Sequence, residues 1–336
     1  MSDLPDIPFF DLGGAGPLAL IEQAPGYAHG MISCGRQQYS PMAVDVMDRL
    51  SRRWAHKATS PYLAELQAAG EADLPGGIWF MNHAYEWGCT TCASQDESSG
   101  GVSLRRSLDW PFDGLGRHVV VARQDSPAGP YVNITWPGFL GVITAMAPGR
   151  FAIAINQAPV LRRASFLPRW CWPVDWVISR WTTWQSDFRA PGFLLRQVFE
   201  SCETYADAKK MLSETPIALP VFYTIAGTEP DQACVIERLA ERARVFEDPA
   251  AVANHWLSPD LEGRSRGQES ETRRQRICAA AQDPDAALLT GGFSWLTPPV
   301  LNKDTRLAVE ANARTGRLVV QGYEKTGAAT TVFSLP

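Results

Sequence analysis

The sequence predicts an α+β fold in which two antiparallel sheets are sandwiched between helices. Two kinds of pattern carry this prediction. Alternating or β-branched runs, punctuated by Gly and Pro, indicate strands, and apolar residues at i, i+3 and i+4 spacings indicate helices. The strand patterns cover 89–156, 221–256 and 306–334. The helical patterns cover 41–69, 174–183, 192–212 and 269–282. Strands, helices, strands, one helix and strands again is the order expected of such a sandwich.

The chain ahead of the first strand pattern divides in two. Residues 1–40 are rich in Pro and Gly and predict one strand or extended arm around 8–12. A helical pattern then runs from 41 to about 69. Ser60 and Pro61 restart it as a second helix, because Ser suits the N-cap and Pro the first helical position.

The strongest chemical signal is Cys89, which lies between a glycine and two threonines. Arg106 and Asp109 follow 17 and 20 residues later, a spacing that suits a β-hairpin turning at 96–101. Antiparallel pairing would bring both charged side chains back towards Cys89. The sequence therefore predicts a cysteine, an arginine and a carboxylate at one end of a hairpin.

A cut before Cys89 would give this residue two chemical roles. Its thiol is a nucleophile, and its new α-amine, with an ordinary pKa of about 7.7–8.0, can accept the thiol proton without a histidine. This is the logic of the N-terminal-nucleophile hydrolases.

The motifs around Cys89 also carry a resemblance to a known family. Their order and spacing over about residues 60–325 are similar to those of the acid ceramidase and N-acylethanolamine acid amidase family. The matching segments are Tyr85-Glu86, Cys89-Thr90-Thr91, 106–112, 138–144, 148–151, 155–156, 205–209, 220–227 and 299–303.

The resemblance implies a domain organisation and a processing step. It implies the αββα fold of the N-terminal-nucleophile hydrolases, with residues 1–88 as a helical α-chain, similar to a propeptide. Residues 89–336 would be the catalytic β-chain of one composite domain. Cleavage between Gly88 and Cys89 would leave an α/β heterodimer, with homo-oligomerisation open, and no cofactor is required.

The resemblance also assigns roles around the nucleophile. Asp109 would accept a hydrogen bond from the freed α-amine, and Arg106 would hold the surroundings of the sulfur through its planar donors. Asn156 and Asn254 would donate to the oxyanion of a tetrahedral intermediate. Arg273 matches a family arginine on a helix, although three arginines in four residues leave its register open by one position.

Glu86, Trp176 and Trp181 are the candidate substrate-binding residues. The segment 170–184 carries five of the 12 tryptophans of the chain. Either it is a helix packed on the sheets, or it is an apolar wall over an acyl-binding pocket.

Three positions depart from the family pattern and bear on substrate, processing and pH optimum. The family's His-Gly-Arg-Asn is replaced by 104–107, Leu-Arg-Arg-Ser. Gln157 replaces a Glu that follows the first oxyanion Asn, and His255 and Trp256 follow the second.

Other interpretations of the cysteines stay open at this point. Cys89 and Cys92 form a C-x-x-C, which suits a redox pair, a zinc site or a buried structural pair. The other five cysteines are scattered singly, and the five histidines show no metal spacing. A papain-like Cys-His site is also open, since its histidine need not be near in sequence. In the preferred frame Cys92 faces the opposite side of the strand and is structural.

Composition limits the partners. The net charge is −5 and no basic run stands out, which argues against nucleic acid. There is no stretch of about 18 apolar residues and no signal-peptide pattern. An odd number of cysteines, seven, indicates reduced thiols. We expect a bacterial-type, cytoplasmic member without a transmembrane segment.

These observations together predict an amidase. Its substrate would be a small, linear N-acyl amide with an apolar acyl chain, hydrolysed through a Cys89 thioester. An acyltransferase that uses the same acyl-enzyme is the first alternative, and a degenerate, non-catalytic binding protein is the second.

Overall fold

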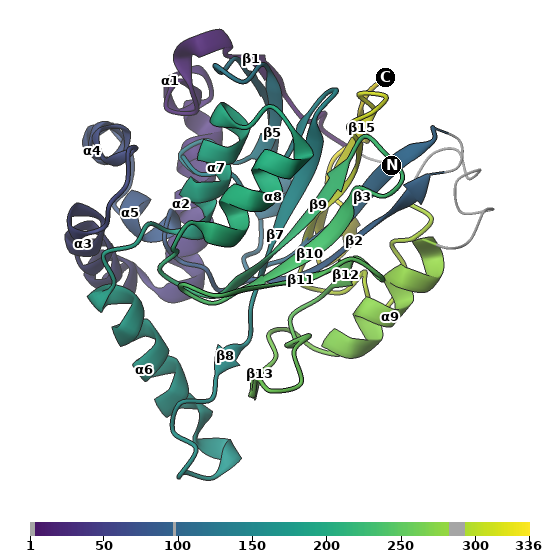
Figure 1. Ribbon diagram of the computed structural model, residues 1–336. Helices are drawn as coiled ribbons and strands as arrows, with labels where there is room; N and C mark the ends of the chain where they lie inside the picture. The colour runs from purple at the N-terminus through teal and green to yellow at the C-terminus, as the bar shows by residue number, and fades with distance from the viewer. Residues whose placement is uncertain (1–3, 97–98, 282–292) are drawn as a thin grey trace.

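The computed structural model describes residues 4–96, 99–281 and 293–336. In this part of the chain two sheets stack against each other (Figure 1). The strand order of the first is β1 (Phe9–Asp11), β4 (Val120–Gln124), β5 (Tyr131–Thr135), β6 (Thr144–Ala147), β7 (Phe151–Gln157), β9 (Val221–Gly227), β10 (Ala233–Arg238), β11 (Ala243–Phe246). That of the second is β12 (Ala251–Val252), β2 (Gly88–Asp96), β3 (Gly101–Asp109), β14 (Thr305–Asn312), β15 (Leu318–Glu324), β16 (Gly327–Ala328), with β17 (Phe333–Leu335) also on β15.

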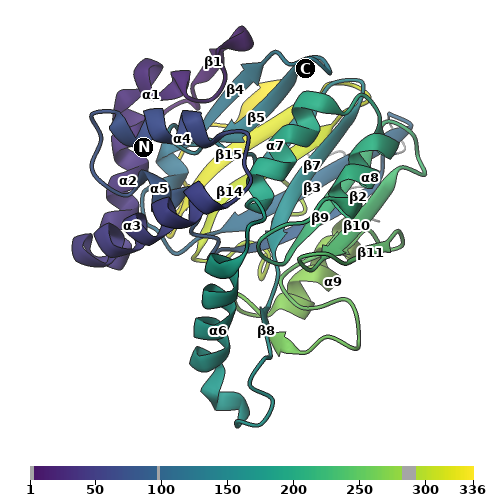
Figure 2. The same cartoon turned by 60° about the vertical axis from the view of Figure 1, so that its left-hand side comes forward.

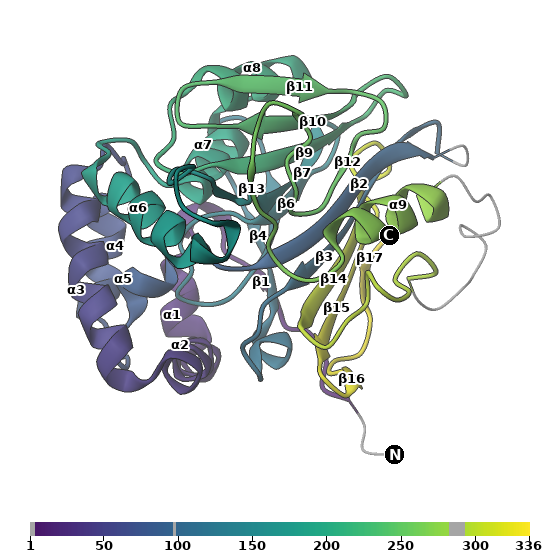
Figure 3. The same cartoon turned by 90° about the horizontal axis from the view of Figure 1, so that it is seen from below.

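Helices cover the outer faces of both sheets. On the first sheet lie α7 (Pro191–Ser201) and α8 (Tyr205–Glu214), which bury Leu194 and Leu212 with the apolar residues of β7 and β9. On the second lies α9 (Ser270–Ala281), whose Ile277 packs in one cluster with Cys92 of β2. Seen from below, these helices lie on opposite sides of the sheet pair (Figure 3). The predicted α+β sandwich of helices and two antiparallel sheets is confirmed.

Burial on both faces explains the continuous apolar runs. Every residue of β7 and of β9 is buried, because one face meets the helices and the other meets the second sheet. A strand buried on both faces carries apolar residues without alternation. Among the strands of the described residues the pairings are antiparallel with one exception, β1, which runs parallel to β4.

The strand predicted within residues 1–40 is confirmed, and the structure adds helices there that the Pro- and Gly-rich pattern did not indicate. The expected strand is present as β1, but most of the segment is helical. The helices of the first 88 residues are α1 (Ala19–Gln23), α2 (Pro25–Tyr39), α3 (Pro41–Lys57), α4 (Leu63–Glu71) and α5 (Ile78–Met81). Pro25 stands at the first turn of α2, where its missing N–H costs nothing. Gly30 lies against the His118 ring, where a Cβ would come within 2.0 Å of Nε2. Here Pro starts a helix and Gly allows close packing.

The tryptophan-rich segment forms α6 (Trp172–Gln185), which extends away from the sheets (Figure 2). Near it, β8 (Val160–Leu161) pairs with β13 (Gly263–Arg264). No helix of the described residues combines the length and the hydropathy that a membrane span needs.

The predicted hairpin is confirmed. β2 and β3 pair in register from Gly88 opposite Asp109 to Asp96 opposite Gly101. The strand predicted at 252–256 is largely wrong, since β12 ends at Val252. The chain leaves the sheet there because the Asn254 N–H donates to the Ser270 hydroxyl, at 2.7 Å, instead of to a neighbouring strand.

Candidate active site

Cys89 is the second residue of β2, and its side chain lies between the two sheets with no exposed surface. Its Sγ lies 3.0 Å from Nη2 of Arg106, which donates to it. The thiol in turn can donate to the Ile155 carbonyl of β7, 3.7 Å away. The nucleophile predicted from sequence is therefore held by both sheets.

Arg106 enters the site from β3, where it stands opposite Thr91. It is fully buried, and its Nη1 donates to the Thr144 hydroxyl on β6. Burial raises the pKa of the Cys89 thiol; the Arg106 charge lowers it and the Asp109 charge raises it, and the net shift is upward. This upward shift favours the neutral thiol, and the neighbouring Arg106 cation can stabilise a thiolate once it forms.

Asp109 closes the end of the hairpin opposite Gly88. Its carboxylate accepts hydrogen bonds from Asn302 Nδ2 at 3.0 Å and from the Thr305 hydroxyl at 2.9 Å, and it pairs with Arg273 at 3.3 Å. Burial raises the pKa of Asp109, and the Arg273 charge opposes that shift only in part. Asn302 was missed as a site residue, although the motif at 299–303 contained it.

Asn254 and Arg273 hold the backbone of Cys89 from two directions. The Cys89 N–H donates to Asn254 Oδ1 at 2.8 Å, and Arg273 Nη1 donates to the Cys89 carbonyl at 2.8 Å. Arg273 Nη2 also donates to Asn254 Oδ1, at 3.0 Å. Of the neighbouring arginines between which the sequence could not choose, Arg273 is therefore the one that reaches Cys89, whereas Arg274 donates to Ala251 O.

The two asparagines direct their amide N–H groups at backbone carbonyls. Asn156 Nδ2 lies 3.1 Å from Val252 O, and its Oδ1 accepts from the Thr91 hydroxyl at 2.5 Å. Asn254 Nδ2 donates to Gln157 O at 2.8 Å. Both residues lie around Cys89, and their role as oxyanion donors stays a prediction.

Cys92 faces away from this cluster. It is buried against α9, where a hydrogen bond with Cys278 raises its pKa well above that of an ordinary thiol. No disulfide joins cysteines of the described chain. Nor do three His, Cys, Asp or Glu side chains gather in a metal-binding group anywhere in residues 4–96, 99–281 and 293–336.

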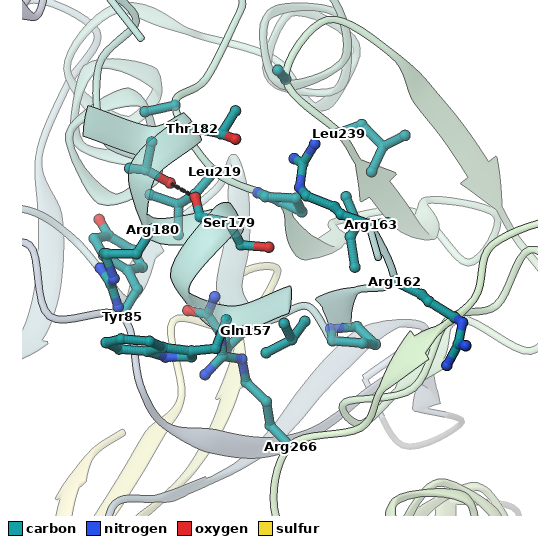
Figure 4. Close-up of a pocket in the computed structure, with 18 of the residues that line it drawn as sticks. Tyr85, Gln157, Arg162, Arg163, Ser179, Arg180, Thr182, Leu219, Leu239 and Arg266 are labelled. Carbon is teal, nitrogen blue, oxygen red and sulfur yellow. Dashed lines mark hydrogen bonds between the residues drawn. The ribbon is translucent and has the colours of Figure 1, made fainter. Parts of the chain in front are cut away.

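Two cavities approach the site from outside, and Cys89 lines neither. The first, of about 400 Å³, lies beside α6 (Figure 4). The second, of about 620 Å³, reaches Gly88, Asp109 and Asn302. Glu86 and Trp176 line both cavities, so they form part of the wall between them.

The wall between the cavities is an ion cluster. The Glu86 carboxylate accepts from Arg180 of α6, from Arg266 in the loop after β13, and from Trp176 Nε1 at 3.1 Å. Of the three predicted substrate-binding residues, Glu86 and Trp176 are therefore at the cavities. Trp181 is 61% exposed and lines neither of them. Arg180 and Arg266 were missed, because nothing in their sequence surroundings distinguishes them.

Comparison with known proteins identifies related sequences and one related fold. A family model described as acyl-coenzyme A:6-aminopenicillanic acid acyl-transferase matches residues 187–287. Human acid ceramidase is 28% identical over 198 residues, which cover 53% of this chain and 47% of that protein. The N-acylethanolamine-hydrolysing acid amidase of Oryctolagus cuniculus is 26% identical over 185 residues, covering 53% and 48%. The chain thus spans about half the length of the curated relatives it matches.

The structural comparison concerns the fold. The Caenorhabditis elegans ortholog of N-acylethanolamine-hydrolysing acid amidase superposes with a TM-score of 0.51 at 17% identity. The match covers 74% of this chain and 100% of that one. At this identity the match shows a shared fold.

Proposed function

We propose that this chain, which is similar in sequence to acid ceramidase and N-acylethanolamine-hydrolysing acid amidase and shares the fold of the latter's Caenorhabditis elegans ortholog, is a cysteine amidase that activates itself. The cut would fall between Gly88 and Cys89. The mature enzyme would hydrolyse the C–N bond of linear N-acyl amides, and the two fragments would stay together as an α/β heterodimer.

One observation carries this proposal. Three groups with the required chemistry meet the three reactive parts of Cys89: Arg106 its sulfur, Asn254 its N–H and Arg273 its carbonyl. A structural cysteine needs none of these partners, and its burial alone would suffice. The set is already assembled in the uncut chain.

Processing would begin with attack of Cys89 Sγ on the Gly88 carbonyl. The C–N bond breaks, the nitrogen of Cys89 takes a proton and becomes an α-amine, and Gly88 is held as a thioester. Water then hydrolyses the thioester and leaves a carboxylate on Gly88. Arg106 would stabilise the attacking thiolate, and Asn254 would hold the departing nitrogen.

Turnover of substrate would repeat this chemistry with the α-amine as base. The amine takes the thiol proton, the sulfur attacks the amide carbonyl, and Asn156 and Asn254 would turn their N–H groups to the oxyanion. The proton then goes to the leaving amine, and water hydrolyses the remaining thioester. An apolar acyl chain is supported by the tryptophan side of the second cavity, formed by Trp87, Trp172 and Trp176, whereas charged residues line much of the rest of that cavity.

A second candidate function is acyl transfer. The family model that matches residues 187–287 is described as an acyl-transferase. In that reaction an amine or alcohol, in place of water, would take the acyl group from Cys89. Product analysis with an added amine separates the two reactions, because only transfer gives a new amide.

Mass spectrometry of the purified protein tests the proposal. The wild type should give one fragment of 88 residues and another with the remaining 248 of the 336. Cys89→Ala should stay whole and should not hydrolyse an N-acylethanolamine. A cut that persists in Cys89→Ala would refute self-processing, and a wild type that stays whole and inactive would favour a non-catalytic binding protein.

A further inference from the structure

The ion cluster between the cavities, formed by Glu86, Arg180 and Arg266, has two positive charges and one negative charge, and the lining of the first cavity is also mainly positive. Five arginines line the first cavity, and Glu86 is the only acidic residue among its described lining residues. The arginines are Arg162, Arg163, Arg180, Arg242 and Arg266. Figure 4 shows Arg180 and Arg266 at the border of this cavity, with Gln157 between them. At the centre of the cluster, the Glu86 carboxylate therefore pairs with both Arg180 and Arg266.

This carboxylate is held as an ion. Burial raises the pKa of Glu86, but Arg266 and Arg180 lower it further than burial raises it, so the net shift is downward. The side chains of Arg180 and Arg266 are only 12% and 17% exposed. Two mostly buried guanidinium groups left without an anion would be unfavourable. Any event that removes Glu86 therefore leaves an anion-binding site.

Processing supplies such an event. Glu86 is three residues ahead of Cys89, so a cut after Gly88 makes it part of a new chain end. Chain ends are free to move unless they are tied down. Cys89 is fully buried and lines neither cavity, whereas Glu86, Trp87 and Gly88 line the second, so movement of these three residues would open a path from that cavity towards the sulfur.

We propose that Arg180, Arg266 and Trp176 Nε1 form a carboxylate-binding subsite, which Glu86 fills in the precursor and the substrate fills in the mature enzyme. The inference rests on the proposed amidase function and adds a substrate class to it, N-acyl amino acids. The substrate carboxylate would lie on the leaving amine and not at the end of the acyl chain, because Glu86 is close to Cys89 along the chain. Three residues span at most about 10 Å, which is shorter than an extended long acyl chain.

Two substrates that differ only in charge test the subsite. An N-acylglycine and an N-acylethanolamine with the same acyl chain differ by a carboxylate in place of a hydroxymethyl group. Processed wild-type enzyme should favour the acylglycine in kcat/KM by about tenfold or more, since two charge-assisted hydrogen bonds are gained. A ratio near one, or a preference for the ethanolamide, overturns the inference and leaves the amidase proposal intact.

Variants locate the preference. Arg180→Gln and Trp176→Phe should each lower the ratio of the two kcat/KM values, mainly through KM for the acylglycine. Arg242→Gln removes an exposed arginine of the same cavity and should keep the wild-type ratio. An equal loss in Arg242→Gln would mean a diffuse charge effect and would refute the subsite.

Processing is checked first by gel, because Arg180 also pairs with Glu86 in the precursor. If Arg180→Gln is not cut, Trp176→Phe, which removes one neutral donor, decides the question. The absence of Cys89-dependent hydrolysis of either substrate would refute the proposed function itself.

Discussion

The surroundings of Cys89 and those of Glu86 are built in opposite ways. Around Cys89, the polar partners come from strands, from one helix of the sandwich and, for Asn254, from the loop after β12, and Arg106, Asp109 and Arg273 are almost wholly buried. Around Glu86, the partners come from α6 and a loop, and the carboxylate sits on the segment that the proposed cut would free. Under the proposed function, the chemical groups would be in place before activation, whereas access and recognition would depend on the movement of a short segment.

The largest effect is expected from Arg273→Lys. Lysine keeps the charge but cannot donate at once to Cys89 O, Asn254 Oδ1 and Asp109, as the guanidinium does. Both the rate of processing and kcat should fall by about 10²–10³, measured by gel densitometry and by steady-state kinetics. Arg274→Lys is the matched control, since Arg274 donates to Ala251 O at the edge of the site and to none of the three Arg273 acceptors. If Arg274→Lys lowers the rate of processing and kcat as much as Arg273→Lys does, the rigid cluster is not centred on Arg273.

The pH dependence of processing should also be steep. The pKa of the Cys89 thiol lies above its ordinary value, so the thiolate is a minor species that grows about tenfold per pH unit below that pKa. Protein made by cell-free synthesis should therefore process about tenfold faster at pH 8 than at pH 7. A rate that instead rises towards acid pH would show that a protonated carboxyl, such as Asp109 with its raised pKa, is required.

Acyl-chain length should change kcat/KM more moderately. Each methylene buried in the second cavity should add roughly 0.8 kcal/mol, or about fourfold, until the cavity is full. Trp176→Ala should flatten this dependence across a series of N-acyl amides. Trp181→Ala should leave it within about twofold of wild type, because that side chain is exposed and away from both cavities. Equal effects of the two substitutions would mean that α6 moves as a unit on activation.

The smallest effect on activity is expected from Cys92→Ser. Its side chain packs against α9 on the outer face of β2, away from the Cys89 sulfur. The free energy of unfolding of the precursor should fall by about 1–3 kcal/mol, because a buried hydroxyl replaces an apolar thiol, as measured by urea titration. Processing and kcat should persist. If Cys92→Ser abolishes activity and Cys89→Ser does not, the nucleophile has been misassigned.

Local features of the fold and site could be predicted from sequence. The hairpin that joins Cys89, Arg106 and Asp109 follows from the strand pattern and from spacing along one stretch of chain. Asn254 and Arg273 lie far from Cys89 in sequence, and only the family resemblance indicated them. α2 was missed because its Gly and Pro residues are ordinarily signals of turns.

Arg180 and Arg266 could not be predicted at all. They are 86 residues apart in sequence, and what brings both to Glu86 is the direction in which α6 leaves the sheets and the path of the loop after β13. Neither depends on a local pattern. Tertiary packing alone makes the cluster, and a single sequence carries no signal for it.

The pairing of β1 with β4 bears on the kinetics of folding. β1 belongs to the segment before the proposed cut, yet it is a strand of the first sheet, and residues on both sides of Cys89 share one apolar core. The precursor would fold in a first-order reaction, whereas the cut protein, once unfolded, would have to recover β1 from a separate molecule. Its refolding would become second order, so its yield would rise with protein concentration. The cut would then make an assembly that forms readily once, as a single chain, and re-forms from dilute fragments only slowly.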